Sequence, residues 1–129
     1  MVEREEIFRY VKQKFGTSPE YLWPKFSSDA VLRNATSSKW YVVAMTVEKK
    51  KLGLKGEGSC EILNVKCDPI MIGSLLDGRE YLPGYHMNKS NWLSVHLDGN
   101  LCREEVFDLI DLSYEMTQKK FKKEKVSSC

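Results

Sequence analysis

The stretch NWLSVHLDG, residues 91–99, decides the fold because apolar and polar residues alternate along it. Successive side chains of an extended chain point to opposite sides, so this alternation predicts a strand with one side in the core. The core-facing set comprises Leu93, Val95 and Leu97. The opposite set comprises Trp92, Ser94 and His96. Asp98 and Gly99 then favour a turn that ends the strand.

Segments before this strand extend the two-sided pattern. Residues 60–67 alternate in the same way, with Leu63, Val65 and Cys67 opposite Ile62, Asn64 and Lys66. The run KWYVVAMTV, residues 39–47, is β-branched and aromatic and predicts the longest strand. Shorter extended segments are predicted at 21–26 and 30–33. A turn is predicted at 34–38 and a long lysine- and glycine-rich connection at 48–58.

Helical spacing of apolar residues marks both ends of the chain. Residues 3–15 have this spacing and Gly16 follows as a stop, while residues 103–121 form a longer amphipathic stretch. Pro69 favours the first turn of a short helix that runs to Leu76, before the last strand. The element order predicts an α+β fold in which the two terminal helices cover one face of a sheet.

The opposite sheet face is predicted to be open and is a candidate surface for a partner. Its candidate residues are Trp40, Asn64, Trp92 and His96. Aromatic side chains on an open sheet can stack on bases or pack against a protein. The alternative is that the tryptophans lie at the edge of the core beside half-buried polar residues, because tryptophan is usually largely buried.

Bulk composition sets the class of protein. The chain has 129 residues, of which 42% are apolar, which is enough for one compact core. The formal net charge is +2, but five lysines and one glutamate at 119–125 contribute +4, which leaves −2 for the rest. We therefore expect a single domain at 1–118 and a basic tail at 119–129. The charged N-terminus and the lack of a long apolar run predict a soluble, cytoplasmic protein. We expect a monomer.

Three lysine-bearing segments supply the candidate contacts for nucleic acid. The candidates are Lys49, Lys50, Lys51, Lys55, Lys66, His86, Asn88, Lys89 and Trp92. Lysines can neutralise phosphates, and the aromatic side chains can stack on bases. The arginines are not clustered, so no side chain is an obvious candidate for recognising guanine bases. Binding should therefore be weak, salt-sensitive and sequence-nonspecific. A solvated lysine loop without any ligand explains the same residues.

Catalytic and metal sites are not predicted. A Cys–His pair of Cys67 and His86 would need proximity that the sequence does not indicate, and no catalytic motif is present. His86 can instead pin its loop through backbone groups while Asn88 caps the turn. The four cysteines have no zinc spacing, and acidic residues are not gathered around His86 or His96. We expect reduced thiols, no metal and no cofactor.

Several segments together resemble the MmcQ/YjbR family, from about Arg4 to Thr117. They are KWYVVAMTV at 39–47, KLGLKG at 51–56, LNVKCDP at 63–69 and LPGYHMNKSNWLSVHLDG at 82–99. The resemblance implies a frataxin-like (CyaY-like), double-wing fold. In that fold about five strands form a twisted antiparallel sheet, the N- and C-terminal helices pack on one face, and a short helix precedes the last strand.

The family motif maps onto particular positions of this chain. The matching positions are Lys55, Gly56, Asn64, Lys66, Asp68, Pro69, residues 83–89 and Trp92. Asn91 stands where the family often has histidine, which weakens a metal interpretation, and Cys102 replaces a common proline at the last helix. The resemblance implies a DNA-binding protein. The alternative is a protein-interaction module that uses the tryptophan-bearing face and has no enzymatic activity.

Overall fold

The computed structural model describes residues 2–118. Its α-helices are α1 (Arg4–Phe15), α2 (Pro69–Leu75) and α3 (Arg103–Thr117). Its strands are β1 (Ala30–Arg33), β2 (Trp40–Glu48), β3 (Ser59–Lys66), β4 (Tyr81–Pro83) and β5 (Trp92–His96). Two short 3-10 helices, η1 (Pro24–Phe26) and η2 (Lys49–Leu52), complete the described elements. The predicted α+β class is confirmed, whereas the predicted tail at 119–129 lies outside the described residues.

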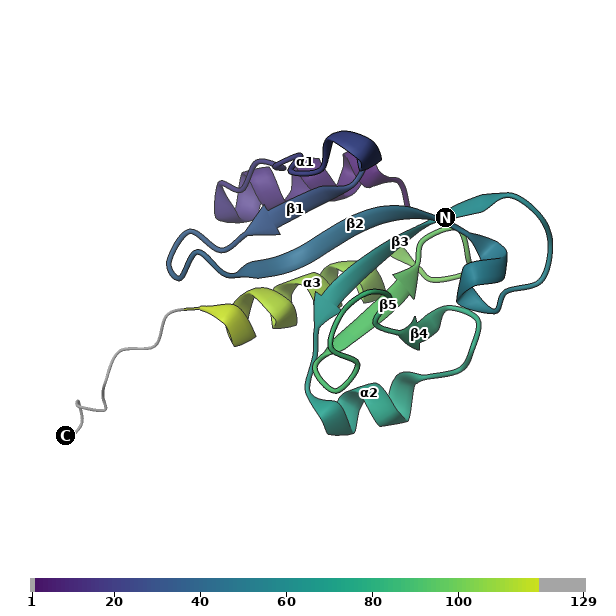
Figure 1. Cartoon of the computed structure of the whole chain (residues 1–129). Coiled ribbons are helices and arrows are strands. Elements are labelled where there is room, and N and C mark those ends of the chain that lie inside the picture. Colours follow the sequence, from purple (N-terminus) through teal and green to yellow (C-terminus); the bar gives the residue numbers. More distant parts are fainter. Residues whose placement is uncertain (1, 119–129) are drawn as a thin grey trace.

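All five strands join one antiparallel sheet in the order β1-β2-β3-β5-β4 (Figure 1). The central pairing sets Asn64 of β3 opposite Ser94 of β5. At one edge, β4 is a three-residue strand that the sequence pattern did not predict. Its proline is tolerated there because an edge strand needs fewer ladder donors.

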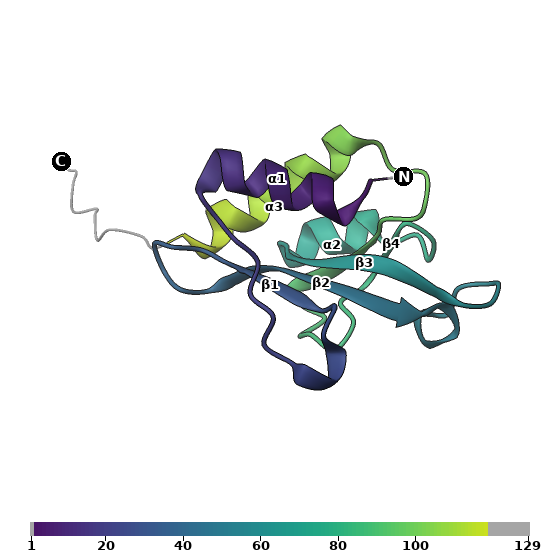
Figure 2. The same ribbon diagram turned by 90° about the horizontal axis from the view of Figure 1, so that it is seen from above.

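The three helices cover the same face of the sheet (Figure 2). Helix α1 packs on α3, where the rings of Tyr10 and Phe107 stack at 3.9 Å and the Tyr10 hydroxyl donates to Asp111 at 2.7 Å. The hydroxyl of Ser113 ties α3 to two strands: its Oγ donates to the Tyr41 carbonyl at 2.6 Å and accepts from the Lys66 N–H at 2.8 Å. The buried polar group is therefore satisfied in both of its roles.

The core lies between the sheet and the helices, as strand alternation predicted. Its members under the helices include Leu63, Val65, Cys67, Leu93, Val95 and Leu97. Within residues 2–118, no helix combines the length and the apolar character that crossing a membrane requires.

Local signals explain most element ends. Gly16 ends α1 at φ 71°, and the Asp68 side chain accepts from the Ile70 N–H at the start of α2. Cys102 begins α3 as part of a capping box with Glu105. One prediction is wrong: residues 21–26 are not an extended segment, because Pro24 starts the 3-10 helix η1. Helix α3 is described only to Thr117, short of the predicted end at 121.

Candidate functional site

The face opposite the helices carries a pocket of about 470 Å³. Strand β2 supplies its floor, chiefly Val43 and Met45. One wall is the connection between α1 and β1, and the other is the loop from Gly84 to Asn91. Figure 2 shows both segments on the side of the sheet away from the helices. The pocket is a concave, mainly apolar site built on the face that we expected to be open.

The first wall is aromatic. Trp23 and Phe26 line the pocket from the α1–β1 connection, and Trp40 joins them from the start of β2. The rings of Trp23 and Trp40 meet edge to face, with centroids 5.8 Å apart. A backbone bridge between Glu20 and Val31 holds this connection against β1. The sequence pattern indicated Trp40 but missed Trp23 and Phe26, because their connection has neither helical nor strand periodicity.

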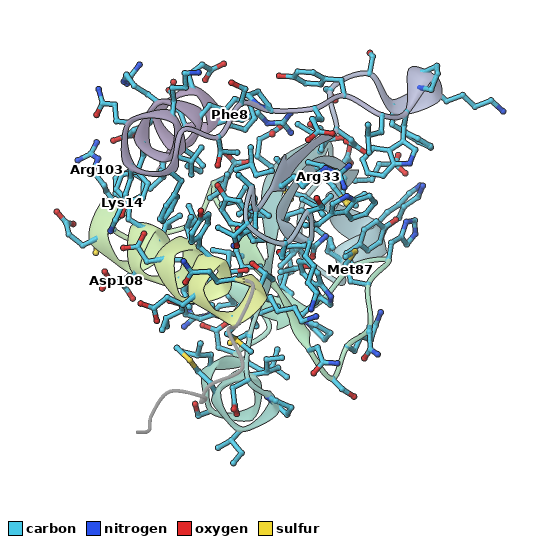
Figure 3. The ribbon with its side chains drawn as sticks, turned by 90° about the vertical axis from the view of Figure 1, so that its left-hand side faces the viewer. Phe8, Lys14, Arg33, Met87, Arg103 and Asp108 are labelled. Atoms are coloured by element: carbon cyan, nitrogen blue, oxygen red, sulfur yellow. The ribbon has the colours of Figure 1, made fainter. Side chains whose placement is uncertain are left out.

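The second wall consists of Tyr85, His86 and Met87. Figure 3 shows Met87 on the side of the sheet opposite Phe8 and Lys14 of α1. The rings of Tyr85 and His86 stack at 4.0 Å. His86 has φ 60°, a left-handed conformation that is uncommon for a residue other than glycine. Its exposed imidazole lies at the rim of the pocket.

Buried polar side chains of the sheet hold the second wall in place. The Tyr85 N–H donates to Ser94 Oγ at 2.9 Å, and Asn64 Nδ2 donates to the Tyr85 carbonyl at 3.1 Å. We expected His86 to pin this loop, but Asn64 and Ser94 do so. The capping role predicted for Asn88 is present, because its side chain accepts from the Ser90 N–H at 2.9 Å.

Asp29 is the buried carboxyl group of the pocket, whose lining also includes the exposed Glu48. Asp29 is only 5% exposed, and the Thr46 N–H donates to its Oδ1 at 3.3 Å. Burial raises the pKa of Asp29, although the Thr46 hydrogen bond and the charge of Arg4 act in the opposite direction. A buried carboxyl beside aromatic rings can accept a hydrogen bond from the polar edge of a bound molecule. Nothing in the sequence pattern singled this residue out.

The predicted nucleic-acid contacts separate into two groups. Lys49, Lys50 and Lys51 form η2 beside the pocket, and Lys51 lines it. Lys66 lies at the last residue of β3, whereas η2 lies before the first residue of that strand. The eight residues of β3 span roughly 23 Å, so Lys66 and η2 lie at opposite ends of the strand. Proximity in sequence did not give proximity in space for the lysines.

The side chains of the second group are engaged within the protein. Lys66 Nζ lies 5.6 Å from the centre of the Trp92 ring, and Lys89 Nζ donates to the Gly84 carbonyl at 3.0 Å. Lys55 remains exposed in the connection after η2. The candidates beside the pocket are therefore the lysines of η2 and His86.

The prediction that this sheet face is open is wrong, although the predicted alternation of side chains along the strands is correct. Asn64 is fully buried and Trp92 is 8% exposed, because the 84–91 loop folds over them. Gly84 packs directly on Trp92, so that a Cβ at position 84 would lie 2.8 Å from the Trp92 Cβ. His96 is half-buried at the far end of β5, and Trp40 alone of the four candidates lines the pocket.

Comparisons with known proteins match most of the chain. The model of the YjbR family matches residues 12–116. The uncharacterized protein YyaQ of Bacillus subtilis is 44% identical over 118 residues, which cover 92% of this chain and 100% of YyaQ. The uncharacterized protein YjbR of Escherichia coli K12 is 42% identical over 33 residues, 26% of this chain and 28% of that protein.

Solved structures have the same architecture. A crystal structure of a Pseudomonas syringae protein has a TM-score of 0.87 and 33% identity, and covers 91% of this chain and 100% of its own. A Deinococcus radiodurans protein with a DUF419 domain has a TM-score of 0.67 and 23% identity, with 93% and 82% coverage. This second likeness shows the fold alone.

Proposed function

The chain belongs to the YjbR family, and from that premise we propose that it binds single-stranded nucleic acid without sequence preference and without catalysing a reaction. The observation that carries the proposal is an aromatic pocket of about 470 Å³ beside three consecutive lysines. An unpaired base occupies the pocket, and the neighbouring phosphates contact η2.

The pocket offers what a base requires. Trp23, Trp40 and Tyr85 present ring faces or edges around it. Stacking of one base on an aromatic side chain contributes about 1–3 kcal/mol and is tolerant of sequence. Asp29 supplies an acceptor for an exocyclic amine. A base within a duplex is stacked and cannot enter such a pocket without being extruded, so single strands should bind more tightly than duplexes.

The lysines supply the electrostatic part of the interaction. Lys50 and Lys51 are exposed, and Lys51 lies 3.6 Å from Glu48 in a solvent-exposed ion pair that costs little to break. Few phosphates can be contacted by one short turn, so affinity should be low and should fall with salt. Lys66, Lys89 and Trp92 are left out of this interface because they interact at the other end of β3.

A protein segment is the second candidate occupant. Tyr21, Leu22 and Phe26 are exposed by 56%, 42% and 62%, and Phe26 lines the pocket. Exposed apolar side chains beside an apolar pocket suit an anchor residue of a partner protein. This alternative also involves no catalysis, in agreement with the lack of a catalytic motif in the sequence.

Fluorescence anisotropy of labelled single-stranded DNA and a matched duplex, at about 50 and 200 mM salt, tests the proposal. Lys50→Gln/Lys51→Gln should weaken binding and reduce its salt dependence. Arg9→Gln/Lys12→Gln on α1 removes the same charge from the opposite face and should have no effect. Phe26→Ala should weaken binding to single strands at both salt concentrations.

Three results would contradict the proposal. They are an absence of binding at low salt, equal losses in the two charge variants, and binding that disappears only when the lysines at 119–125 are replaced by glutamine. Capture of a protein that depends on Phe26, without any binding of DNA, would favour the second candidate.

A further inference from the structure

A second cluster of functional groups lies at the end of the β3–β5 pairing. Ile62 pairs with His96, so Cys60, two residues earlier, lies on the same face of the sheet as His96. Asp98 follows His96 by two residues in the turn after β5. The Cys60 Sγ, a His96 ring nitrogen and an Asp98 carboxylate oxygen all lie within 4.8 Å of one another.

The hydrogen bonding of His96 leaves one nitrogen ready to bind a ligand. Nδ1 lies 3.1 Å from the Arg79 carbonyl, which can only accept, so Nδ1 carries the proton. Nε2 then presents its lone pair. It is buried, and no hydrogen-bond partner for it occurs among residues 2–118. Histidines that ligate metals usually donate their other N–H to a carbonyl or carboxylate in this way.

From these observations we propose that Cys60, His96 and Asp98 bind a divalent transition-metal ion such as Zn²⁺. Thiolate, imidazole and carboxylate together match zinc, whereas Mg²⁺ and Ca²⁺ prefer oxygen ligands alone. Bond lengths to tetrahedral zinc set the ligand atoms about 3.3–3.6 Å apart. The three ligand atoms already lie within 4.8 Å of one another, so they need to move only slightly closer. Asp98 is exposed, so water can reach the ion and complete the tetrahedron.

This proposal differs from the sequence-based expectation of no metal site. That expectation considered the two histidines as a pair, with acidic residues not gathered around either of them. The antiparallel register joins Cys60 to His96 and Asp98, which are 36 and 38 positions away in the chain. The site is also separate from the proposed base pocket, whose lining contains none of the three residues.

Titration of the reduced chain, residues 1–129, with Zn²⁺ against a chromophoric chelator, and with Co²⁺ followed by absorption, tests the site. The exposed Cys102 and also Cys129 are replaced by serine in every sample, to remove other thiols. We expect one equivalent of metal, a rise in melting temperature, and a thiolate-to-cobalt charge-transfer band.

The variants assign the ligands. Cys60→Ser should abolish the charge-transfer band, and His96→Gln should lower zinc affinity at least about tenfold. Asp98→Asn should also lower the affinity, while its amide oxygen can still accept the Glu61 N–H that Asp98 accepts at 2.9 Å. Because Asp98 is exposed, this variant should fold even if Cys60→Ser does not.

Matched controls come from the same chain. Cys67→Ser alters a buried cysteine on the opposite face of the sheet, and His86→Gln alters the other histidine. Both should bind metal as the parent does. A charge-transfer band that persists in Cys60→Ser, losses in Cys67→Ser equal to those in Asp98→Asn, or an absence of saturable binding would each overturn the proposal.

Discussion

Ser94 Oγ donates to Asn64 Oδ1 at 2.5 Å across the centre of the sheet, and both side chains are fully buried. The same two residues hold the backbone of Tyr85. Asn64 and Ser94 therefore orient each other and also hold Tyr85, which belongs to the second wall of the pocket. This hydrogen-bond network links the interior of the sheet to the candidate site.

Ser94→Ala removes the acceptor of the Tyr85 N–H and the donor to Asn64. We expect the free energy of unfolding to fall by about 1–3 kcal/mol, because buried polar groups lose their hydrogen-bond partners. Amide hydrogen exchange at Tyr85 should also accelerate. Ser90→Ala, at an exposed position of the same loop, is the control and should change stability little. Equal effects in the two variants would contradict the role given to the network.

Gly84→Ala should destabilise the protein by about 1–3 kcal/mol, because the new Cβ would lie 2.8 Å from both Cβ and the carbonyl oxygen of Trp92. Gly73→Ala in α2 is the matched control. Apart from its chain neighbours and the backbone of its own helix, nothing would lie within 4 Å of its Cβ, so it should stabilise the protein by about 0.5–1 kcal/mol. Urea unfolding measures both. Opposite signs support the close packing of the loop on Trp92.

Stability should fall as the pH rises from about 10 to about 12. Burial raises the pKa of Tyr41 to about 12. Burial and, to a smaller extent, the negative charge of Glu105 raise the pKa of Tyr81 to about 12. In this range the unfolded tyrosines lose their protons while the folded ones retain them, so alkali favours unfolding. The contribution of the two protonated tyrosines to the free energy of unfolding is fully present below about pH 10.

Tyr41→Phe and Tyr81→Phe should each flatten this alkaline loss, and the double variant should flatten it most. Thermal melts at stepped pH follow the effect. Tyr41→Phe should also cost about 1 kcal/mol at neutral pH, because the Tyr41 hydroxyl donates to Thr17 Oγ1 at 2.6 Å. An unchanged alkaline slope in the double variant would exclude these tyrosines as its source.

Asp77→Asn should reduce the loss of stability in acid. Hydrogen bonds from the backbone N–H groups of Tyr81 and Arg79 lower the pKa of Asp77 below 3.8. Its contribution is therefore present above about pH 4 and is lost as the pH falls through the lowered pKa. Asparagine retains the acceptor oxygen but does not titrate.

Urea unfolding from about pH 3 to pH 6 measures this acid effect. Asp108→Asn, at an exposed position of α3, is the control. The explanation fails if Asp77→Asn retains the acid dependence of the parent.

The sequence predicted the fold because periodicity reports which side of an element is buried. The alternation at Leu93, Val95 and Leu97 placed the core correctly, and the stop at Gly16 ended α1 as expected. The three-residue strand β4 is too short to show a period, and Pro83 argues against a strand. Its pairing arises from the tertiary structure.

The candidate site was less predictable because exposure depends on what covers a face. Strand alternation placed Asn64 and Trp92 correctly but could not show that the 84–91 loop covers them. Trp23, Phe26 and Asp29 lie in a connection without a period, and their meeting with Tyr85 depends on long-range packing. An aromatic pair within a short, proline-containing connection was the available signal for that wall.

Apart from Trp40, both walls of the pocket belong to connections, while the helices cover the opposite face and bury the core there. Recognition and folding therefore depend on largely separate sets of residues, so each can be varied by itself. Exchange of residues 20–29 or 85–87 between homologues should transfer binding preference as a module, provided that Asn64 and Ser94 are retained as its attachment points. Such exchange gives an engineer a way to change the ligand without redesigning the scaffold.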